Sequence, residues 1–206
     1  RAATEEQLTD NLLRQLNSML AEGSATIEVK SGYGLTTKDE LKMLRAIATA
    51  AEHFPGTLVP TALIAHAIDP EQPDFINTTI NETLPAVTTE FPAITIDAYC
   101  EKGAWSFKDT VRLFDAALEA GHPIRVHTDQ FNELGITQWC IDRALEGAPV
   151  RSVDHLEATS PETLNRIADS PLFAVALPCS GFHVDQRYAD ARTYLDHNPR
   201  GGLVLA

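Results

Sequence analysis

Residues 124–131 read IRVHTDQF, an apolar, β-rich run that ends in a histidine and passes directly into polar turn sequence. Two other stretches have the same form, TALIAHAID at 61–69 and RSVDHLEAT at 151–159. The histidines concerned are His66, His127 and His155. In a parallel α/β barrel every strand delivers its last residues to one rim, so these imidazoles are predicted to converge on one cavity. Convergent imidazoles indicate a bound metal ion.

Strand-like and helix-like segments alternate along the whole chain. The predicted strands are 25–30, 57–67, 93–100, 124–129, 150–156 and 172–178, with the start of a seventh at Leu203. The predicted helices are 4–21, one capped by Thr37 with Glu40 as its capping-box partner, 74–90, 106–120, 133–146, 160–169 and 187–197, with a loop over 179–185. The spacing of roughly 25–35 residues is that of one βα unit. Such alternation predicts a parallel sheet whose strands are buried on both faces.

A closed barrel and an open doubly wound sheet both fit this alternation. The barrel is favoured because chemically active residues end almost every strand: Lys30, His66, Cys100 with Glu101, His127, His155 and Cys179. An open sheet concentrates its ligands at one switch point. A closed barrel takes about 250 residues, and this chain has 206. We therefore expect an incomplete (β/α)8 TIM-like barrel that lacks its first strand and most of its eighth.

The composition disfavours several classes of protein. A net charge of −13, from 29 acidic and 16 basic residues, opposes binding to nucleic acid. No apolar run approaches the ~18 residues that a membrane span needs, so we expect a cytoplasmic location and no membrane partner. The three cysteines are too few and too irregularly spaced for a disulfide framework or a zinc knuckle, which predicts reduced thiols.

His127 is the strongest ligand candidate, because polar residues 128–130 follow it and could orient its ring. A core histidine bonded to a carbonyl is the commoner role for a lone histidine, but the repeated strand-end placement favours a ligand. His155 lies one strand later and could share a metal ion or a metal-bound water with His127. A neutral imidazole suits either ligand or general-base work. For the preceding Asp154, a hydrogen-bonding role is equally open.

A second set of candidates offers groups that could hold a substrate. Tyr33 presents a hydroxyl in the turn SGYG, whose glycines allow close approach of the backbone, although a purely structural turn is at least as common. His66 is flanked by alanines, which leaves room for a ligand, and Gln130 can both donate and accept hydrogen bonds. The sequence has no HExxH, GxSxG or P-loop motif. Two or three imidazoles alone hold a catalytic zinc incompletely.

Six motifs, taken together, resemble the imidazolonepropionases of the amidohydrolase superfamily. They are EVKSGYGL with DELKMLR, PTALIAHA, CEKGAWS, VHTDQF, SVDHLEATS and LPCSGFH, in the family's order and spacing over nearly the entire chain. The resemblance implies a distorted (β/α)8 barrel with a small β-sandwich. Residues 1–206 would then be a partial barrel domain without the flanking β-sandwich domain. The implied reaction is hydrolysis of the cyclic amide of 4-imidazolone-5-propanoate to N-formimino-L-glutamate, in histidine degradation.

The resemblance also implies roles for individual residues. His127 corresponds to a metal ligand and His155 to the catalytic histidine beside the metal-bound water, while Tyr33, His66 and Gln130 correspond to substrate contacts. The implied cofactor is one zinc or iron ion, whose other family ligands, a His-x-His pair and an eighth-strand acid, lie outside residues 1–206. Some relatives have glutamate where this chain has Gln130, and many have Gly-Ala in place of residues 179–180. The general base, His155 or the eighth-strand acid, stays open.

Two other functions compete with this hypothesis. A related amidohydrolase, such as a cyclic deaminase acting on an exocyclic amine, would share the barrel and the histidine pair. An inactive barrel fragment is the second alternative, since a barrel without its first strand leaves unpaired edges, and we expect little activity from the isolated chain. The expected partner is a small-molecule substrate, with no nucleic acid and no membrane, and any assembly is expected to be a homodimer.

Overall fold

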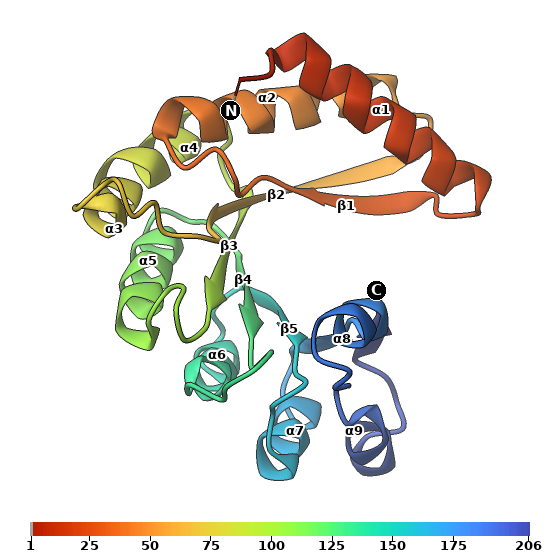
Figure 1. Ribbon diagram of the computed structural model, residues 1–206. Helices are drawn as coiled ribbons and strands as arrows, with labels where there is room; N and C mark the ends of the chain where they lie inside the picture. The colour runs from red at the N-terminus through yellow and green to blue at the C-terminus, as the bar shows by residue number, and fades with distance from the viewer. Residues whose placement is uncertain (1) are drawn as a thin grey trace. The chain divides into compact units, whose positions relative to one another are not determined.

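The computed structural model describes residues 2–206, in which strands and helices alternate along the chain (Figure 1). The strands are β1 (Thr26–Lys30), β2 (Thr57–Ala65), β3 (Thr95–Cys100), β4 (Ile124–Thr128), β5 (Val150–His155), β6 (Phe173–Ala176) and β7 (Leu203–Leu205). The helices are α1 (Glu5–Ala21), α2 (Thr37–His53), α3 (Phe75–Thr78), the π-helical turn η1 (Thr79–Thr83), α4 (Leu84–Glu90), α5 (Phe107–Glu119), α6 (Ile136–Leu145), α7 (Pro161–Ala168), α8 (Pro178–Val184) and α9 (Ala191–His197). The chain divides into two compact units, one ending at Ile96 and one running from Asp97 to Ala206.

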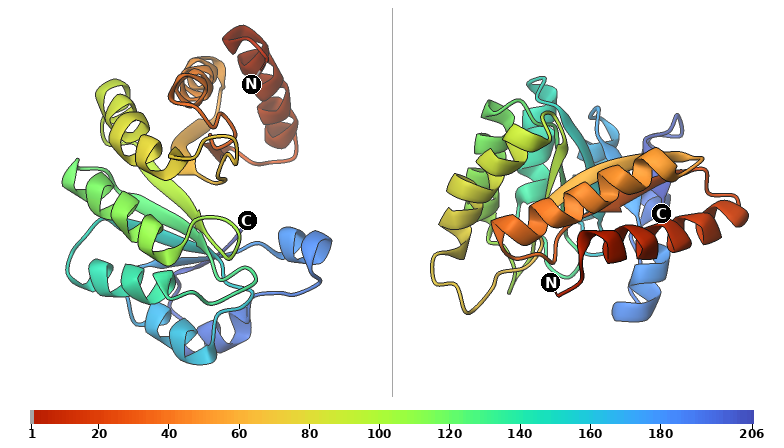
Figure 2. Two further views of the ribbon diagram at one scale, coloured as in Figure 1. Left: turned by 60° about the vertical axis from the view of Figure 1, so that its left-hand side comes forward. Right: turned by 90° about the horizontal axis from the view of Figure 1, so that it is seen from above.

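In the first unit, helices α1 and α2 lie side by side along the parallel strands β1 and β2 (Figures 1 and 2). Thr4 caps helix α1 in a capping box, because the Thr4 hydroxyl accepts from the Gln7 amide and the Gln7 side chain accepts from the Thr4 amide. The apolar stripe of α1 packs Leu16 into a core with Ile27, Ala50 and Phe54. Burial of this stripe, more than helix propensity, holds such a surface helix in place.

In the second unit the strands follow chain order, and the pairs β4–β5, β5–β6 and β6–β7 are parallel. Helices α5, α6, α7 and α9 line one side of these strands (Figure 2). Side chains such as Ile124, Val126 and Val153 are fully buried, as expected of strands covered on both faces. The predicted fold class is confirmed: residues 2–206 contain seven strands in successive βα units, against eight in a closed (β/α)8 barrel.

The structure corrects three local predictions. Segment 179–185, expected as a loop, lies mostly in α8, which Pro178 opens at a position where a missing N–H costs nothing. The helix expected over 74–90 is present over 75–90, but it contains the π turn η1, which ends two residues before Pro85; the proline ring removes an N–H from the helical ladder. Helix α2 is capped by Thr36, and not by Thr37, because the Thr36 hydroxyl accepts from the Asp39 amide.

Glu40 therefore has another role than the capping-box partner that we expected. Its buried Oε1 atom accepts from the amides of Gly34 (2.7 Å) and Leu35 (3.2 Å), and so holds the turn that follows β1. A Cβ atom at Gly34 would come within 2.5 Å of the Glu40 amide nitrogen, which explains the glycine. Burial raises the pKa of the Glu40 carboxyl, and hydrogen bonds from Ser31 and from the turn backbone lower it in part.

We expect Glu40→Gln to remove a pH-dependent part of the stability. Because the folded-state pKa lies above the ordinary 4.5, the folded protein holds this proton more tightly than the unfolded chain, and this contribution to stability is lost as pH rises through the raised pKa. The free energy of unfolding of the wild type should therefore fall relative to that of E40Q above about pH 4.5. Urea unfolding across a pH series measures the difference, and parallel profiles would contradict it.

No helix among residues 2–206 combines the length and the apolar character needed to cross a lipid bilayer.

Candidate active site

The structure brings His127 and His155 together at the ends of neighbouring strands. His127 lies near the end of β4, and His155 is the last residue of β5. In the parallel register Thr128 pairs with His155, so the two histidines are offset by one position. Their ring centroids are 5.4 Å apart, and the ring planes are inclined by 46°. Both imidazoles can therefore face the same small ligand, whereas the predicted convergence of His66 on that ligand stays a prediction.

Asp97 of β3 holds one nitrogen of the His127 ring. The Asp97 side chain is fully buried, and its Oδ1 atom lies 3.1 Å from the His127 Nδ1 atom and accepts from the Ala98 amide at 2.8 Å. A carboxylate on one ring nitrogen fixes the tautomer and the ring orientation, and it makes the other nitrogen a better metal ligand. This arrangement suits His127 to bind a metal ion through Nε2.

Asp154 completes a group of side chains that could hold a metal ion. Within the described residues, Asp97, His127 and Asp154 each offer one ligand atom, and these atoms all lie within 4.8 Å of one another. Nitrogen and carboxylate oxygen are ligands that zinc and iron accept. The donor set therefore fits a metal ion, and the hydrogen bond to His127 favours an orienting role for Asp97. Asp154 also accepts from the Ser152 hydroxyl at 2.6 Å, which is compatible with either role.

The backbone at His155 is in an unusual conformation. His155 has φ 87° and Leu156 has φ 71°, values that side-chain-bearing residues rarely adopt. Each such residue costs of order 1–3 kcal/mol and persists only where the surrounding structure holds it. The ring is buried, and its Nδ1 atom lies 3.4 Å from the Glu157 carboxylate. The conformation presents the imidazole at the strand end while its neighbours fix its orientation.

Gln130 lies in the turn after β4 and is held from β3. The Tyr99 hydroxyl donates to the Gln130 Oε1 atom at 2.8 Å. Glu101, which the sequence marked only as a strand-end carboxylate, accepts from the amides of Phe131 (2.9 Å) and Asn132 (3.2 Å) and from the Asn132 side chain (2.7 Å). Because the Gln130 Oε1 atom accepts from Tyr99, the Gln130 NH2 group is the end that can donate to a ligand.

Tyr33 and His66 lie beside each other in the unit that ends at Ile96. Their ring centroids are 4.6 Å apart, and Tyr33 is 64% exposed. Gly32, at φ +138°, lets the turn lie against His66, since a Cβ atom there would come within 3.3 Å of the His66 Cβ atom. Among the predicted site residues, the structure thus places Tyr33 beside His66 and His127 beside His155, with Gln130 in the turn after β4.

The sequence interpretation missed Asp97 and Tyr99. Both lie inside the predicted strand, where a polar residue gives little indication of a site. The useful signal was the carboxylate itself, because a charged side chain in a strand that is buried on both faces needs a partner. For Asp154 the sequence left two roles open, and the structure places it in the candidate metal group.

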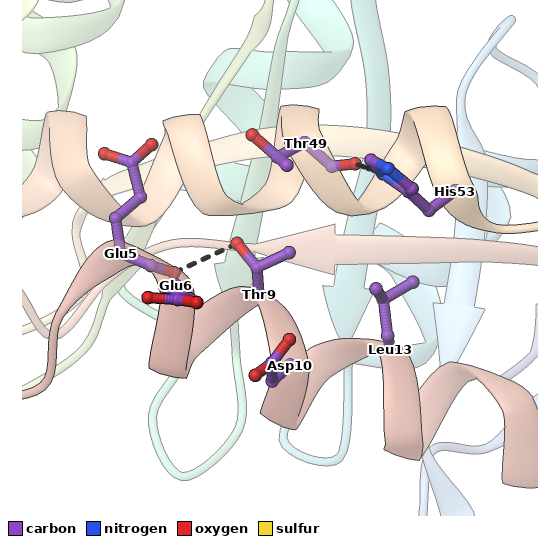
Figure 3. Close-up of a pocket in the computed structure, with 7 residues that line it drawn as sticks. All are labelled: Glu5, Glu6, Thr9, Asp10, Leu13, Thr49 and His53. Carbon is purple, nitrogen blue, oxygen red and sulfur yellow. Dashed lines mark hydrogen bonds between the residues drawn. The ribbon is translucent and has the colours of Figure 1, made fainter.

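A cavity of about 400 Å³ lies between α1 and α2 (Figure 3). Its lining includes Glu5, Glu6 and Asp10 of α1 and His53 of α2, and the His53 Nδ1 atom is engaged with the Thr49 carbonyl at 2.8 Å. None of the predicted site residues lines it.

The buried cysteines are unsuited to nucleophilic chemistry. Cys100 and Cys140 are free thiols in the interior. Burial raises the pKa of Cys100 to about 11 and raises that of Cys140 as well. A thiol with a raised pKa carries little of the reactive thiolate.

Comparison with known proteins supports the resemblance found in the motifs. No protein-family model matches the chain. The chain is 37% identical over 198 residues to imidazolonepropionase of Haloarcula marismortui, covering 95% of this chain and 46% of the relative. It is 37% identical over 218 residues to imidazolonepropionase of Herpetosiphon aurantiacus, covering 100% of this chain and 49% of the relative. The chain therefore resembles imidazolonepropionase along nearly its whole length and spans about half the length of these curated relatives.

Solved structures show the same fold at low sequence identity. A triazine hydrolase from an Arthrobacter species superposes with a TM-score of 0.65 at 14% identity, over 96% of this chain and 48% of that chain. An adenosine deaminase from Xanthomonas campestris with bound zinc gives a TM-score of 0.61 at 14% identity, over 100% of this chain and 46% of that chain. These likenesses establish the barrel fold and nothing about the substrate of this chain.

In a longer protein that contains residues 1–206, we expect Asp97→Asn to weaken zinc binding roughly 10–100-fold, because the substitution removes the charge that orients His127 and strengthens it as a ligand. Titration with zinc measures the affinity. Asp115→Asn is the matched control, since Asp115 is an exposed carboxylate of the same unit that pairs with Arg143. Unchanged zinc affinity in D97N would contradict the assignment of Asp97 as the residue that orients His127.

Proposed function

We propose, from the similarity to the imidazolonepropionases, that this chain is part of a metal-dependent hydrolase that opens the cyclic amide of 4-imidazolone-5-propanoate to give N-formimino-L-glutamate. The observation that best supports this function is the pair of rings of His127 and His155, 5.4 Å apart at adjacent strand ends, with the Asp97 carboxylate on His127 Nδ1. We propose equally that residues 1–206 form part of one barrel domain.

The proposed cofactor is one zinc or iron ion. When bound, the ion lowers the pKa of water towards neutrality and so supplies a nucleophile. In this chain His127 would hold the ion through Nε2, because Nδ1 is engaged by Asp97. Asp154 lies close enough to serve as a further ligand or as an orienting group. A site with three protein ligands needs more than His127 alone, which is consistent with a chain that spans about half of its relatives.

His155 is the base that this chain itself offers. A neutral imidazole can accept a proton near pH 7 and return it to the departing nitrogen. Its Nδ1 atom lies beside the Glu157 carboxylate, which would fix the ring while Nε2 handles the proton. An eighth-strand acid, as the family resemblance implies, would be the other candidate for this proton transfer.

The family resemblance implies three substrate contacts in this chain, Gln130, His66 and Tyr33. The Gln130 NH2 group, oriented by Tyr99 on the amide oxygen, can donate to a carbonyl of the imidazolone ring. His66 would help to orient the ring, and the Tyr33 hydroxyl would donate to the propanoate carboxylate. Donors of this kind select a ligand that carries matching acceptors, because a poor match leaves polar groups unpaired.

The function is tested by offering two kinds of substrate to a longer protein that contains residues 1–206. We expect turnover of 4-imidazolone-5-propanoate, with N-formimino-L-glutamate as the product, and no release of ammonia from aminated heterocycles. Product detection by mass spectrometry together with an ammonia assay separates the two activities. Release of ammonia without ring opening would point to a cyclic deaminase, and inactivity on both substrates would contradict hydrolysis by this site.

The two histidines should respond differently to substitution in that longer protein. We expect His127→Ala to lose the bound metal, because the ligand is gone, and His155→Ala to keep the metal while turnover falls roughly 10²–10⁴-fold, as for loss of a general base. Elemental analysis and turnover measure the two effects. His197→Ala, at an exposed histidine paired with Asp169, is the control and should change neither. Normal metal content in H127A would refute its assignment as a ligand.

A further inference from the structure

Asp129 is a fully buried carboxylate that the proposed reaction does not use. It follows β4 with φ 52°, a left-handed conformation. Its carboxylate accepts hydrogen bonds from three threonine hydroxyls, those of Thr128 (2.8 Å), Thr137 (2.7 Å) and Thr159 (3.0 Å). Thr137 belongs to α6, whereas Thr159 belongs to the turn after β5. One carboxylate thus ties two different segments to the end of β4.

The turn after β5 is the one that carries His155, and its backbone needs support. Two successive residues, His155 and Leu156, have left-handed φ values, a conformation that persists only where other contacts hold it. Three contacts hold this turn against the end of β4. The Leu156 amide donates to the Thr128 carbonyl at 3.3 Å, the Ala158 amide donates to the Asp129 carbonyl at 2.6 Å, and the Thr159 hydroxyl donates to the Asp129 Oδ2 atom at 3.0 Å. Two of the three end on Asp129.

We propose that Asp129 is a positioning residue, which sets the separation of the His127 and His155 rings by holding the turn after β5 through Ala158 and Thr159. His127 is two residues before Asp129 on the same strand end, so a tie from Asp129 to the following turn fixes one ring relative to the other. The hydrogen bond from Thr137, by contrast, secures α6 and does not reach the His155 turn. The consequence for turnover rests on the proposed function, whereas the ring separation does not.

Two isosteric substitutions separate positioning from stability. Thr159→Val and Thr137→Val each remove one hydroxyl from the Asp129 Oδ2 atom, but only the first releases the His155 turn. Thr137 also contacts the Thr128 hydroxyl, so T137V is at least as disruptive to the core. In the 206-residue chain we expect both variants to lower the thermal unfolding midpoint. The nuclear Overhauser effect between the ring CH protons of His127 and His155 should be lost in T159V and kept in T137V.

A rescue completes the test. Asp129→Asn should keep the ring contact, because asparagine tolerates a left-handed φ and threonine hydroxyls can either donate to it or accept from it, whereas Asp129→Ala should lose the contact. An unchanged ring contact in T159V, or its equal loss in T137V, would overturn the proposal. Thr159→Ala is the second hydroxyl-free variant. If T137V folds but neither Thr159 variant does, the hydrogen bond from Thr159 to Asp129 serves only the stability of the fold. That result would also overturn the proposal.

The functional arm uses the longer protein. There T159V should lower kcat roughly 10²-fold, as expected for a displaced catalytic group, with KM and metal content unchanged. T137V should leave kcat as in the wild type, and a kcat of T159V equal to that of the wild type would count against the proposal. If every variant and the wild type are inactive, the proposed function fails. The ring contact in the 206-residue chain then still decides whether Asp129 positions the two histidines.

Discussion

The candidate site depends on the hydrogen bond between the His127 Nδ1 atom and the Asp97 Oδ1 atom, 3.1 Å apart. This bond joins β3 to β4 in the interior, where a charged carboxylate without a partner would cost several kcal/mol. The carboxylate needs a donor, and the imidazole needs a fixed tautomer to act as a ligand. One contact meets both needs, and it determines which ring nitrogen can bind a metal ion.

Other buried carboxylates also accept hydrogen bonds, in their case from the turns at the strand ends. Glu40 accepts amide protons of the turn after β1, Glu101 accepts those of the turn after β4, and Asp129 accepts hydroxyl protons from two segments. A turn at the end of a buried strand has backbone N–H groups that cannot all join the sheet, and such groups must still be paired. Carboxylates fill this role well, because hydrogen bonds to a charged acceptor are stronger than those between neutral groups.

These anchors explain how a site can lie on turns and still be precise. Left-handed residues at His155 and Leu156 are costly, and they are confined to a turn that is bonded directly to the end of β4. The groups that hold this turn come from consecutive βα units. Parallel pairing of β4 with β5 therefore brings them together. The proposed metal ligand, the proposed base and the proposed positioning residue are therefore all supplied by adjacent strands of one unit.

From the amino-acid order alone, the alternation of strands and helices could be predicted, as could the placement of His127 and His155 at strand ends, because both follow from local apolar runs and turn residues. Helix α8 was not predicted, and the cap of α2 was predicted one residue too late. Short helices and caps depend on side-chain partners that cannot be identified from the sequence. Asp97 and the roles of Glu101 and Asp129 became apparent only in the folded chain. Which side chains meet depends on the register between β3, β4 and β5 and on turn conformation, and both arise from contacts between residues distant in sequence.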